Sequence, residues 1–342
     1  MSATPKKYCI IGQGLAGSVL GLLLMERGVA FEIIDDGHRS SSSIIAAGMW
    51  NPISFRKLIL SWEADKFIPV MEEIYPRFEK ILGASFYHKM PLARLFGDHG
   101  SANDWDHRAT ILEVAPYLSA DQHPDIPAFF HQPHGHGMVN NCGWLDMKVF
   151  LSLARTYFEN NGVLRSENFN VNPDDDPETM HVYCTGWQAI HEGLFERITI
   201  TPHKGEVLTV ENVSPITSMV NFGNFIVPLG NNSFRLGATH ELDPKDIDPS
   251  AEGLAELSAS LKSVMRSDFK VVAHHAGFRP TTHDRKPVLG IHPEKPNVAI
   301  FNGLGARGVL QAPRMAQELV NHLLEGSPIR KEISILRFYK KK

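Results

Sequence analysis

The sequence predicts an α/β fold that combines a doubly wound domain with a second, mostly antiparallel β domain. Residues 8–36 show a short apolar strand, a glycine-rich turn, an apolar helical stretch and a second strand, which is the order of a βαβ unit. Residues 298–324 repeat the order strand, glycine-rich turn and helix. Between these stretches, residues 204–240 show strand patterns around an Asn231-Asn232 turn, as is typical of antiparallel strands.

The first glycine-rich turn has the spacing of a dinucleotide-binding fingerprint of the Rossmann type. Gly12 permits a tight turn out of the strand, and Gly14 lets the backbone approach a pyrophosphate. Gly17 lets the helix pack close to the sheet. The free N–H groups at the start of this helix should then face the phosphates. The residues expected to contact or shape this site are Gly12, Gly14, Leu15, Ala16 and Gly17.

An acidic residue, Asp35, ends the second predicted strand at the position that the fingerprint expects. Its carboxylate can accept hydrogen bonds from a ribose diol and would repel a 2′-phosphate, so the sequence disfavours NADP. Asp36, the next residue, is expected to be solvated.

Composition places the chain among ordinary globular proteins of about two domains. It has 342 residues, of which 43% are hydrophobic and 21% charged, and a formal net charge of −4. That net charge does not indicate a basic surface that would bind a polyanion, and only the tail 337–342 is locally basic. Three well-separated cysteines, no leader-like apolar segment and no apolar run of ~18 residues together favour a cytoplasmic protein without a membrane span.

The loop after Asp35 leads to small residues that precede a glycine. Ser42 and Ser43 are candidates for contacts to a phosphate or a polyol, although an ordinary turn would have the same composition. The following residues would let the backbone approach a flat ligand, and they are Ala46, Ala47, Gly48 and Met49.

The middle of the chain alternates helical and strand-like patterns. Helices are predicted over residues 61–82 and 147–160, the second with Asp146 as N-cap. Residues 86–140 are predicted to form short strand pieces of an antiparallel region. Within them, residues 131–136 contain three histidines, but no acid or cysteine completes a ligand set, so a solvated turn is expected and no metal site is predicted.

Gly186 and a second glycine-rich turn, at 303–308, each follow a predicted strand. The strand 180–183 leads into Gly186, which should touch the adenosine half of a dinucleotide. Further strands are expected over 163–171, 205–210, 224–228 and 233–238, and a helix over 250–265. The second glycine-rich turn opens a helix over 311–324 and contributes the candidates Gly305, Ala306, Arg307, Gly308 and Val309. Two such helix starts suit one extended ligand held at both ends.

Several motifs in this order resemble the D-amino-acid oxidase superfamily of flavoproteins, and in particular its glycine oxidase branch. They are the fingerprint, Ala46-Ala47-Gly48-Met49, Cys184-Thr185-Gly186-Trp187, Lys204-Gly205-Glu206, Ile226-Val227-Pro228, Gly237-Ala238-Thr239, Gly277-Phe278-Arg279-Pro280 and residues 303–313. Gly143-Trp144-Leu145 and the turn at Arg307 are also similar to the flavin domain of the bifunctional tRNA enzyme that trims carboxymethylaminomethyl-uridine.

The resemblance implies FAD as cofactor, with a flavin near 46–49 and the helix at Gly308 directed at its N1/O2 edge. Arg279 would grip the carboxylate of the substrate, and Arg307 would join it in the active site. Ile45 and Gly277 stand where some relatives carry a flavin-linked histidine or cysteine, so FAD should be bound non-covalently.

The activity implied is oxidation of the C–N bond of a small amino acid or secondary amine that carries a carboxylate. Hydride passes to flavin N5, the imine is hydrolysed, and O2 or another acceptor reoxidises the flavin. Phe225 replaces a substrate-facing tyrosine of glycine oxidase, which leaves a non-catalytic flavin-binding protein as an alternative. A tRNA wobble-uridine side-chain oxidoreductase is the other alternative, although the net charge disfavours a tRNA partner.

The resemblance also suggests how the domains divide. The FAD-binding domain is predicted to comprise residues 1–85, 142–203 and 271–342, and the substrate-binding domain residues 86–141 and 204–270.

Overall fold

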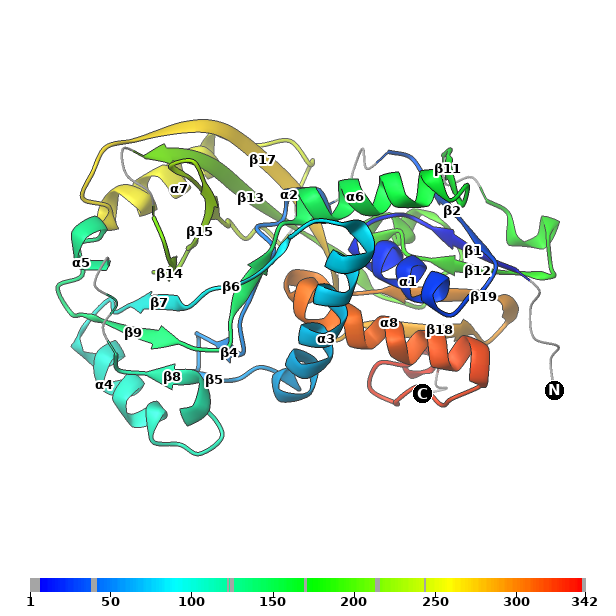
Figure 1. Cartoon of the computed structure of the whole chain (residues 1–342), viewed down its shortest axis with the longest axis horizontal. Helices are drawn as coiled ribbons and strands as arrows, with labels where there is room; N and C mark the ends of the chain where they lie inside the picture. Colours follow the sequence, from blue (N-terminus) through cyan, green and yellow to red (C-terminus); the bar gives the residue numbers. More distant parts are fainter. Residues whose placement is uncertain are drawn as a thin grey trace.

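A six-stranded sheet forms one half of the protein (Figure 1). The computed structural model describes residues 7–37, 42–121, 123, 126–168, 171–212, 216–242 and 244–339. Neighbouring strands pair in parallel except at one edge, where β18 runs antiparallel to β19. In sheet order the strands are β11 (Leu164–Ser166), β2 (Phe31–Asp35), β1 (Lys7–Ile11), β12 (Thr179–Tyr183), β19 (Lys295–Asn302) and β18 (Val288–His292).

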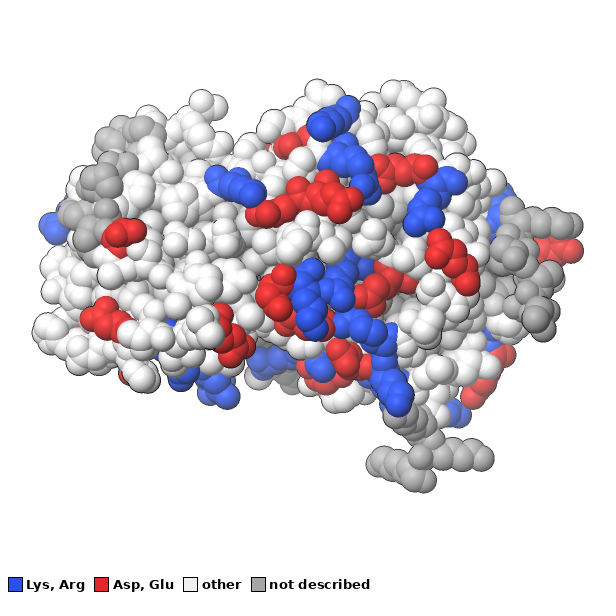
Figure 2. Space-filling model, turned by 60° about the horizontal axis from the view of Figure 1, so that its bottom comes forward, with Lys and Arg blue, Asp and Glu red and all other residues white. Residues whose placement is uncertain are grey.

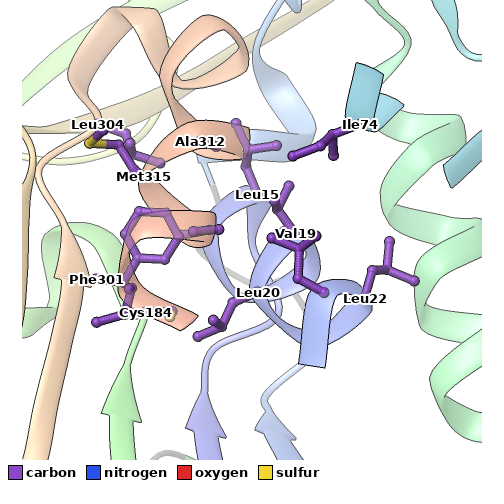
Figure 3. Packing of buried hydrophobic residues seen from close by; sticks show 14 of the residues in the cluster. Leu15, Val19, Leu20, Leu22, Ile74, Cys184, Phe301, Leu304, Ala312 and Met315 are labelled. Atoms are coloured by element: carbon purple, nitrogen blue, oxygen red, sulfur yellow. The ribbon is translucent and has the colours of Figure 1, made fainter. Parts of the chain in front are cut away.

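Alternate residues of β1 are buried on the two faces of this sheet. Tyr8 and Ile10 belong to a core that includes α1 (Leu15–Glu26), α3 (Ala64–Leu82), α6 (Met147–Asn160) and α8 (Gly308–Glu325). Figure 3 shows the side chains of α1 and α8 meeting above Phe301 and Cys184. Cys9 and Ile11 face the other side, where they pack with residues such as Phe195. Because both faces are covered, the strand is apolar almost throughout, as parallel strands usually are.

An eight-stranded, mostly antiparallel sheet forms the other half. Its longest pair joins β13 and β17, and its one parallel pair joins β7 and β14. The helix α7 (Ala251–Val264) packs on it, capped by the Ser250 side chain, which accepts from Gly253 N. In sheet order the strands are β17 (Phe269–Thr282), β13 (Ile200–Asn212), β16 (Ser233–Gly237), β15 (Phe225–Gly230), β14 (Met219–Asn221), β7 (Leu92–Leu95), β9 (His136–Val139) and β8 (Leu118–Ser119).

Shorter elements connect the two halves. The strands β3 (Met49–Trp50), β10 (Gly143–Leu145) and β6 (Tyr87–Lys89) form a third sheet, and β4 (Ile53–Ser54) pairs with β5 (Ile59–Leu60). The remaining helices are α2 (Ser42–Ile45), α4 (His99–Ala109) and α5 (Ile126–Phe129), and the 3₁₀ turns are η1 (Ala115–Tyr117), η2 (Pro173–Asp175), η3 (Gly186–His191), η4 (Gly305–Arg307) and η5 (Ile335–Phe338).

The structure confirms the doubly wound α/β architecture with an antiparallel second sheet and corrects several local predictions. Residues 86–140 are not strands alone, because α4 occupies 99–109 and packs Trp105 against Gly137. Ser42 and Ser43, expected in a loop, begin a helical turn. α8 starts at Gly308, as the family resemblance implies, and not at residue 311, as the sequence pattern indicated. The strand expected over 163–171 covers only β11. Residues 38–41, 169 and 170 lie outside the described part of the chain.

The six-stranded sheet uses strands only from segments assigned above to the FAD-binding domain. In the eight-stranded sheet, β13 and β17 each extend across a predicted boundary, at 203/204 and 270/271. The domain boundaries therefore stay a prediction. Across the described residues, no helix combines the length and the apolar character that a membrane crossing needs.

Candidate cofactor and substrate site

One cavity of about 530 Å³ gathers almost all of the predicted site residues. Of these, only Gly17 does not line it. The predicted residues along its wall are Gly12, Gly14, Leu15, Ala16, Asp35, Ser42, Ser43, Ala46, Ala47, Gly48, Met49, Gly186, Arg279, Gly305, Ala306, Arg307, Gly308 and Val309.

The turn between β1 and α1 has the shape that a pyrophosphate needs. Gly12 has a φ of 98°, and a Cβ on it would lie 2.8 Å from the Cys184 carbonyl oxygen, so only glycine fits. A Cβ on Gly17 would lie 1.9 Å from the Gly12 carbonyl oxygen, which explains why Gly17 packs the helix against the turn and does not line the cavity. No side chain caps the start of α1 at Gly14, although Leu15 N donates to Ser43 Oγ at 3.2 Å.

The carboxylate of Asp35 is fixed at the end of β2. It is 2% exposed, accepts from the backbone N–H of Gln13 at 2.8 Å and of Gly37 at 2.9 Å, and pairs with Arg155 at 2.8 Å. These contacts orient it along the wall of the cavity. Asp36, which we expected to be solvated, lines the cavity as well.

The second glycine-rich turn reaches the same cavity. η4 leads directly into α8, and a Cβ on Gly308 would lie 3.0 Å from Leu15 Cδ2, so the starts of α1 and α8 are in contact. The Tyr75 hydroxyl donates to the Val309 carbonyl at 3.0 Å and so ties α8 to α3. Both helix N-termini thus serve one elongated site.

The backbone of the cavity wall around residues 45–48 is tightly packed. Gly48 has a φ of 71°, and a Cβ there would lie 1.9 Å from the Leu145 carbonyl oxygen. Arg235 Nη1 donates to the carbonyls of Ile45 and Ala46, both at 3.1 Å. A Cβ on Gly277 would lie 3.2 Å from Ile45 Cδ1, so the two positions that carry flavin-linked residues in some relatives face each other without a nucleophile.

Arg279 lies on β17 with its guanidinium directly over Gly205 of β13. A Cβ on Gly205 would be 2.0 Å from Arg279 Nη2, so the glycine provides the space that the guanidinium fills. Arg279 donates only weakly to the carbonyls of Lys204 and Thr239, at 3.4–3.5 Å, and burial lowers its pKa. No carboxylate within the described residues pairs with it.

Arg307 also faces the cavity and donates to Ser61 Oγ. Burial lowers its pKa, and in the described part of the chain it forms no ion pair. It borders a second cavity of about 330 Å³ as well, together with Phe225. The structure therefore brings the two predicted arginines to one site.

Several cavity residues were missing from the sequence-based candidates. His203 lies beside His240, with ring centroids 5.2 Å apart, and its pKa is lowered by burial first and then by His240 and the nearby arginines. His240 lines the cavity as well, whereas His274 and His275 do not, and His274 contacts Glu206 at 2.7 Å. The only sequence signal for His203 was its place just before the Lys204-Gly205-Glu206 motif.

The histidine-rich stretch 131–136 shows no metal-site geometry. His136 Nδ1 lies 2.5 Å from Gln132 Oε1, and His136 Nε2 accepts from His123 N at 3.0 Å. His134 packs edge-on against His99. In the portion of the chain that is described, no group of three or more metal-ligating side chains comes together.

Comparison with known proteins identifies the class. The family model of FAD-dependent oxidoreductases named DAO matches residues 7–322. The chain therefore belongs to the DAO family of FAD-dependent oxidoreductases.

Two relatives illustrate the range of the family. Glycine oxidase of Bacillus subtilis is 28% identical over 223 residues, which cover 61% of this chain and 59% of that protein. The bifunctional protein MnmC of Idiomarina loihiensis, named for tRNA 5-methylaminomethyl-2-thiouridine biosynthesis, is 27% identical over 153 residues, which cover 41% of this chain and 25% of that protein. Each match thus spans less than two thirds of the relative.

Solved structures show the same fold. Glycine oxidase from Geobacillus kaustophilus superposes with a TM-score of 0.79 at 20% identity, over 97% of this chain and 99% of that one. Iminodiacetate oxidase from a Chelativorans species has a TM-score of 0.78 at 18% identity, over 96% and 98%. At these identities the likeness establishes the fold alone.

Proposed function

We propose that the protein oxidises the C–N bond of a small amino acid or secondary amine that carries a carboxylate, with FAD bound non-covalently. The observation that carries this proposal is Arg279, a partly buried guanidinium that faces the cavity without a carboxylate partner among the described residues. A planar, permanently charged fork of this kind matches a carboxylate in a bidentate way.

The residues present fit FAD. The glycine cradle at Gly12 and the start of α1 would hold the pyrophosphate, Asp35 the ribose, and the start of α8 the electron-rich edge of the flavin. When bound, FAD would supply a hydride acceptor for the carbon next to the amine, and water would hydrolyse the imine product. Ile45 and Gly277 offer no side chain for a covalent link.

The main contribution of the protein itself would be to position the substrate. Arg279 would hold the carboxylate and so fix the distance of the reacting carbon from the flavin. Burial lowers the pKa of His203, and His240 and the nearby arginines lower it further. The same surroundings would disfavour a protonated substrate amine, and the oxidation needs that amine neutral. O2 or another acceptor would then reoxidise the flavin.

The test is the visible spectrum of the purified holoprotein, recorded without oxygen while glycine, sarcosine, D-amino acids or proline is added. Bleaching by one of them supports the proposal and identifies the substrate class. Arg279→Ala should weaken the apparent substrate affinity, whereas unchanged affinity in that folded, FAD-containing variant would contradict the role of the arginine.

One observation supports a second candidate, the oxidation of a tRNA wobble-uridine side chain. The Gly305-Ala306-Arg307-Gly308 turn is similar to that of the tRNA enzymes, and such proteins are among the matched relatives. Against it, the face in Figure 2 carries acidic side chains next to basic ones, not a broad basic surface. A tRNA gel shift at low salt that disappears as salt rises would favour this candidate.

A further inference from the structure

The second cavity, of about 330 Å³, lies next to the first, and the two share wall residues. Gly223, Phe225 and Arg307 line both cavities. Arg94 and Arg56 line only the second one. Three arginines therefore line a space next to the proposed substrate site, and no acidic residue among those that the structure describes is part of its wall.

Arg94 was not among the site residues predicted from the sequence. It lies on β7, where parallel pairing sets it opposite Asn221 of β14, and it donates to Asn221 Oδ1. Its guanidinium lies 5.4 Å from the centre of the Phe55 ring. Burial lowers its pKa, and none of the ion pairs among the described residues includes it.

A partly buried guanidinium without an ion pair is costly, because it has lost water without gaining a counter-charge. Arg94 and Arg307 both bear this cost on the wall of one cavity. An anion that enters the cavity would relieve it for both, and their planar forks suit a carboxylate or phosphate.

We propose that the second cavity is an anion subsite formed by Arg94 and Arg307, and that the substrate is therefore an amine with two acidic groups. One group would bind Arg279, as in the proposed function on which this inference rests. The other would reach past Phe225 to Arg94 and Arg307, with its methylene spacer against the rings of Phe55 and Phe225, whose centroids are 6.0 Å apart. The volume lies at the lower end of ligand pockets, which suits a short acidic arm.

The holoenzyme tests this without any mutation. Sarcosine and iminodiacetate differ only in that a second carboxylate extends the methyl group, and anaerobic flavin reduction measures the apparent Kd of each. We expect iminodiacetate to bind roughly 10- to 100-fold more tightly, the range that a charge-assisted hydrogen bond provides. Reduction by sarcosine with no preference for iminodiacetate would overturn the inference and leave the proposed function intact.

A second measurement does not depend on turnover. The flavin absorption spectrum is titrated with glutarate and with butyrate, the carbon analogues of iminodiacetate and sarcosine, which differ by one carboxylate on the terminal carbon. Tighter binding of glutarate supports the subsite even if no amine reduces the flavin, in which case the proposed function fails alone. Equal binding of the two acids contradicts the subsite.

Variants separate a binding role for Arg94 from a structural one. Arg94→Leu should abolish the preference for the diacid, and Arg94→Lys should retain part of it, because the charge remains and the planar fork is lost. Lys57→Leu removes an exposed charge next to Arg56 that does not line the cavity, and should keep the full preference. An Arg94→Leu protein that folds and still prefers diacids would refute the assignment, as would Arg94-dependent binding of tRNA without binding of glutarate.

Discussion

The space for the Arg279 guanidinium depends on one glycine, and adding a methyl group there should displace it. In Gly205→Ala the new Cβ would lie 2.0 Å from Arg279 Nη2 and 2.3 Å from Cζ. Gly205 sits in the long β13–β17 pair, opposite Gly277, in a backbone conformation that alanine can adopt. The colliding atoms are the end of a flexible side chain, so we expect the guanidinium to move and the strand to stay.

The size of the effect follows from this geometry. Ordinary contact with a Cβ begins at 3.4 Å, so Nη2 has to retreat by more than 1 Å. A shift of that size breaks at least one arm of a bidentate grip. A charge-assisted hydrogen bond contributes about 1.5–3 kcal/mol, so the carboxylate should bind roughly 10- to 100-fold more weakly.

Anaerobic titration of the flavin with the reducing amine measures this loss as an apparent Kd. Gly97→Ala is the matched control, since a Cβ on Gly97 meets nothing within 4 Å and the residue does not line the cavity. If the effect acts through Arg279, adding Gly205→Ala to Arg279→Ala should cost no further affinity. A Gly205→Ala protein that retains FAD and wild-type affinity would refute the reasoning.

Three further changes test the cofactor site and the stability of the fold. Gly17→Ala forces a Cβ to 1.9 Å from the backbone oxygen of Gly12, so it should cost about 1–3 kcal/mol and reduce FAD retention, measured by thermal unfolding and the flavin content after gel filtration. Arg155→Met removes the ion pair between Arg155 and the buried Asp35 carboxylate and should cost about 2 kcal/mol in urea unfolding, whereas equal stability would indicate that other contacts of Asp35 replace the pair. Burial raises the pKa of Glu192 to about 7, so the folded state keeps a proton that the unfolded state releases, and stability should fall as pH rises from about 4.5 to 7. Glu192→Gln should therefore be the more stable protein at pH 8, by at most about 3 kcal/mol, and lose this advantage at pH 4.5.

Elements with a complete local signal were predicted well. The first βαβ unit appears as β1, α1 and β2, and α6 spans Met147–Asn160 with the Asp146 carboxylate accepting from Val149 N. The Asn231-Asn232 turn has φ values of 48° and 57°, as a tight hairpin turn requires. In each case neighbouring residues determine the geometry, so their order in the sequence is sufficient information.

Helix α4 shows where such signals fail. Of its residues only Trp105 is buried, so residues 99–109 carry no apolar periodicity. The available signal was Asp98, whose side chain accepts from Ser101 N as an N-cap. The start of α8 was placed too late for a related reason, because glycine at position 308 indicates a turn in isolation, yet Leu15 packs so closely that only a small residue fits there.

The positions of the charged side chains in the site depend on strand register, which the sequence does not reveal. Arg94 meets Asn221, which is 127 residues away, only because β7 and β14 pair in parallel, and Gly205 makes room for Arg279 only because β13 and β17 pair over their whole length. The fingerprint consists of adjacent residues, and it predicts the cofactor, which is common to the whole family. In the function and the subsite proposed above, substrate selection instead depends on Arg94, Arg279 and Arg307, which come from three distant elements and have no acidic partner among the described residues. Because each guanidinium loses solvation without an ion pair among the described residues, the anion that compensates this cost should come from the ligand.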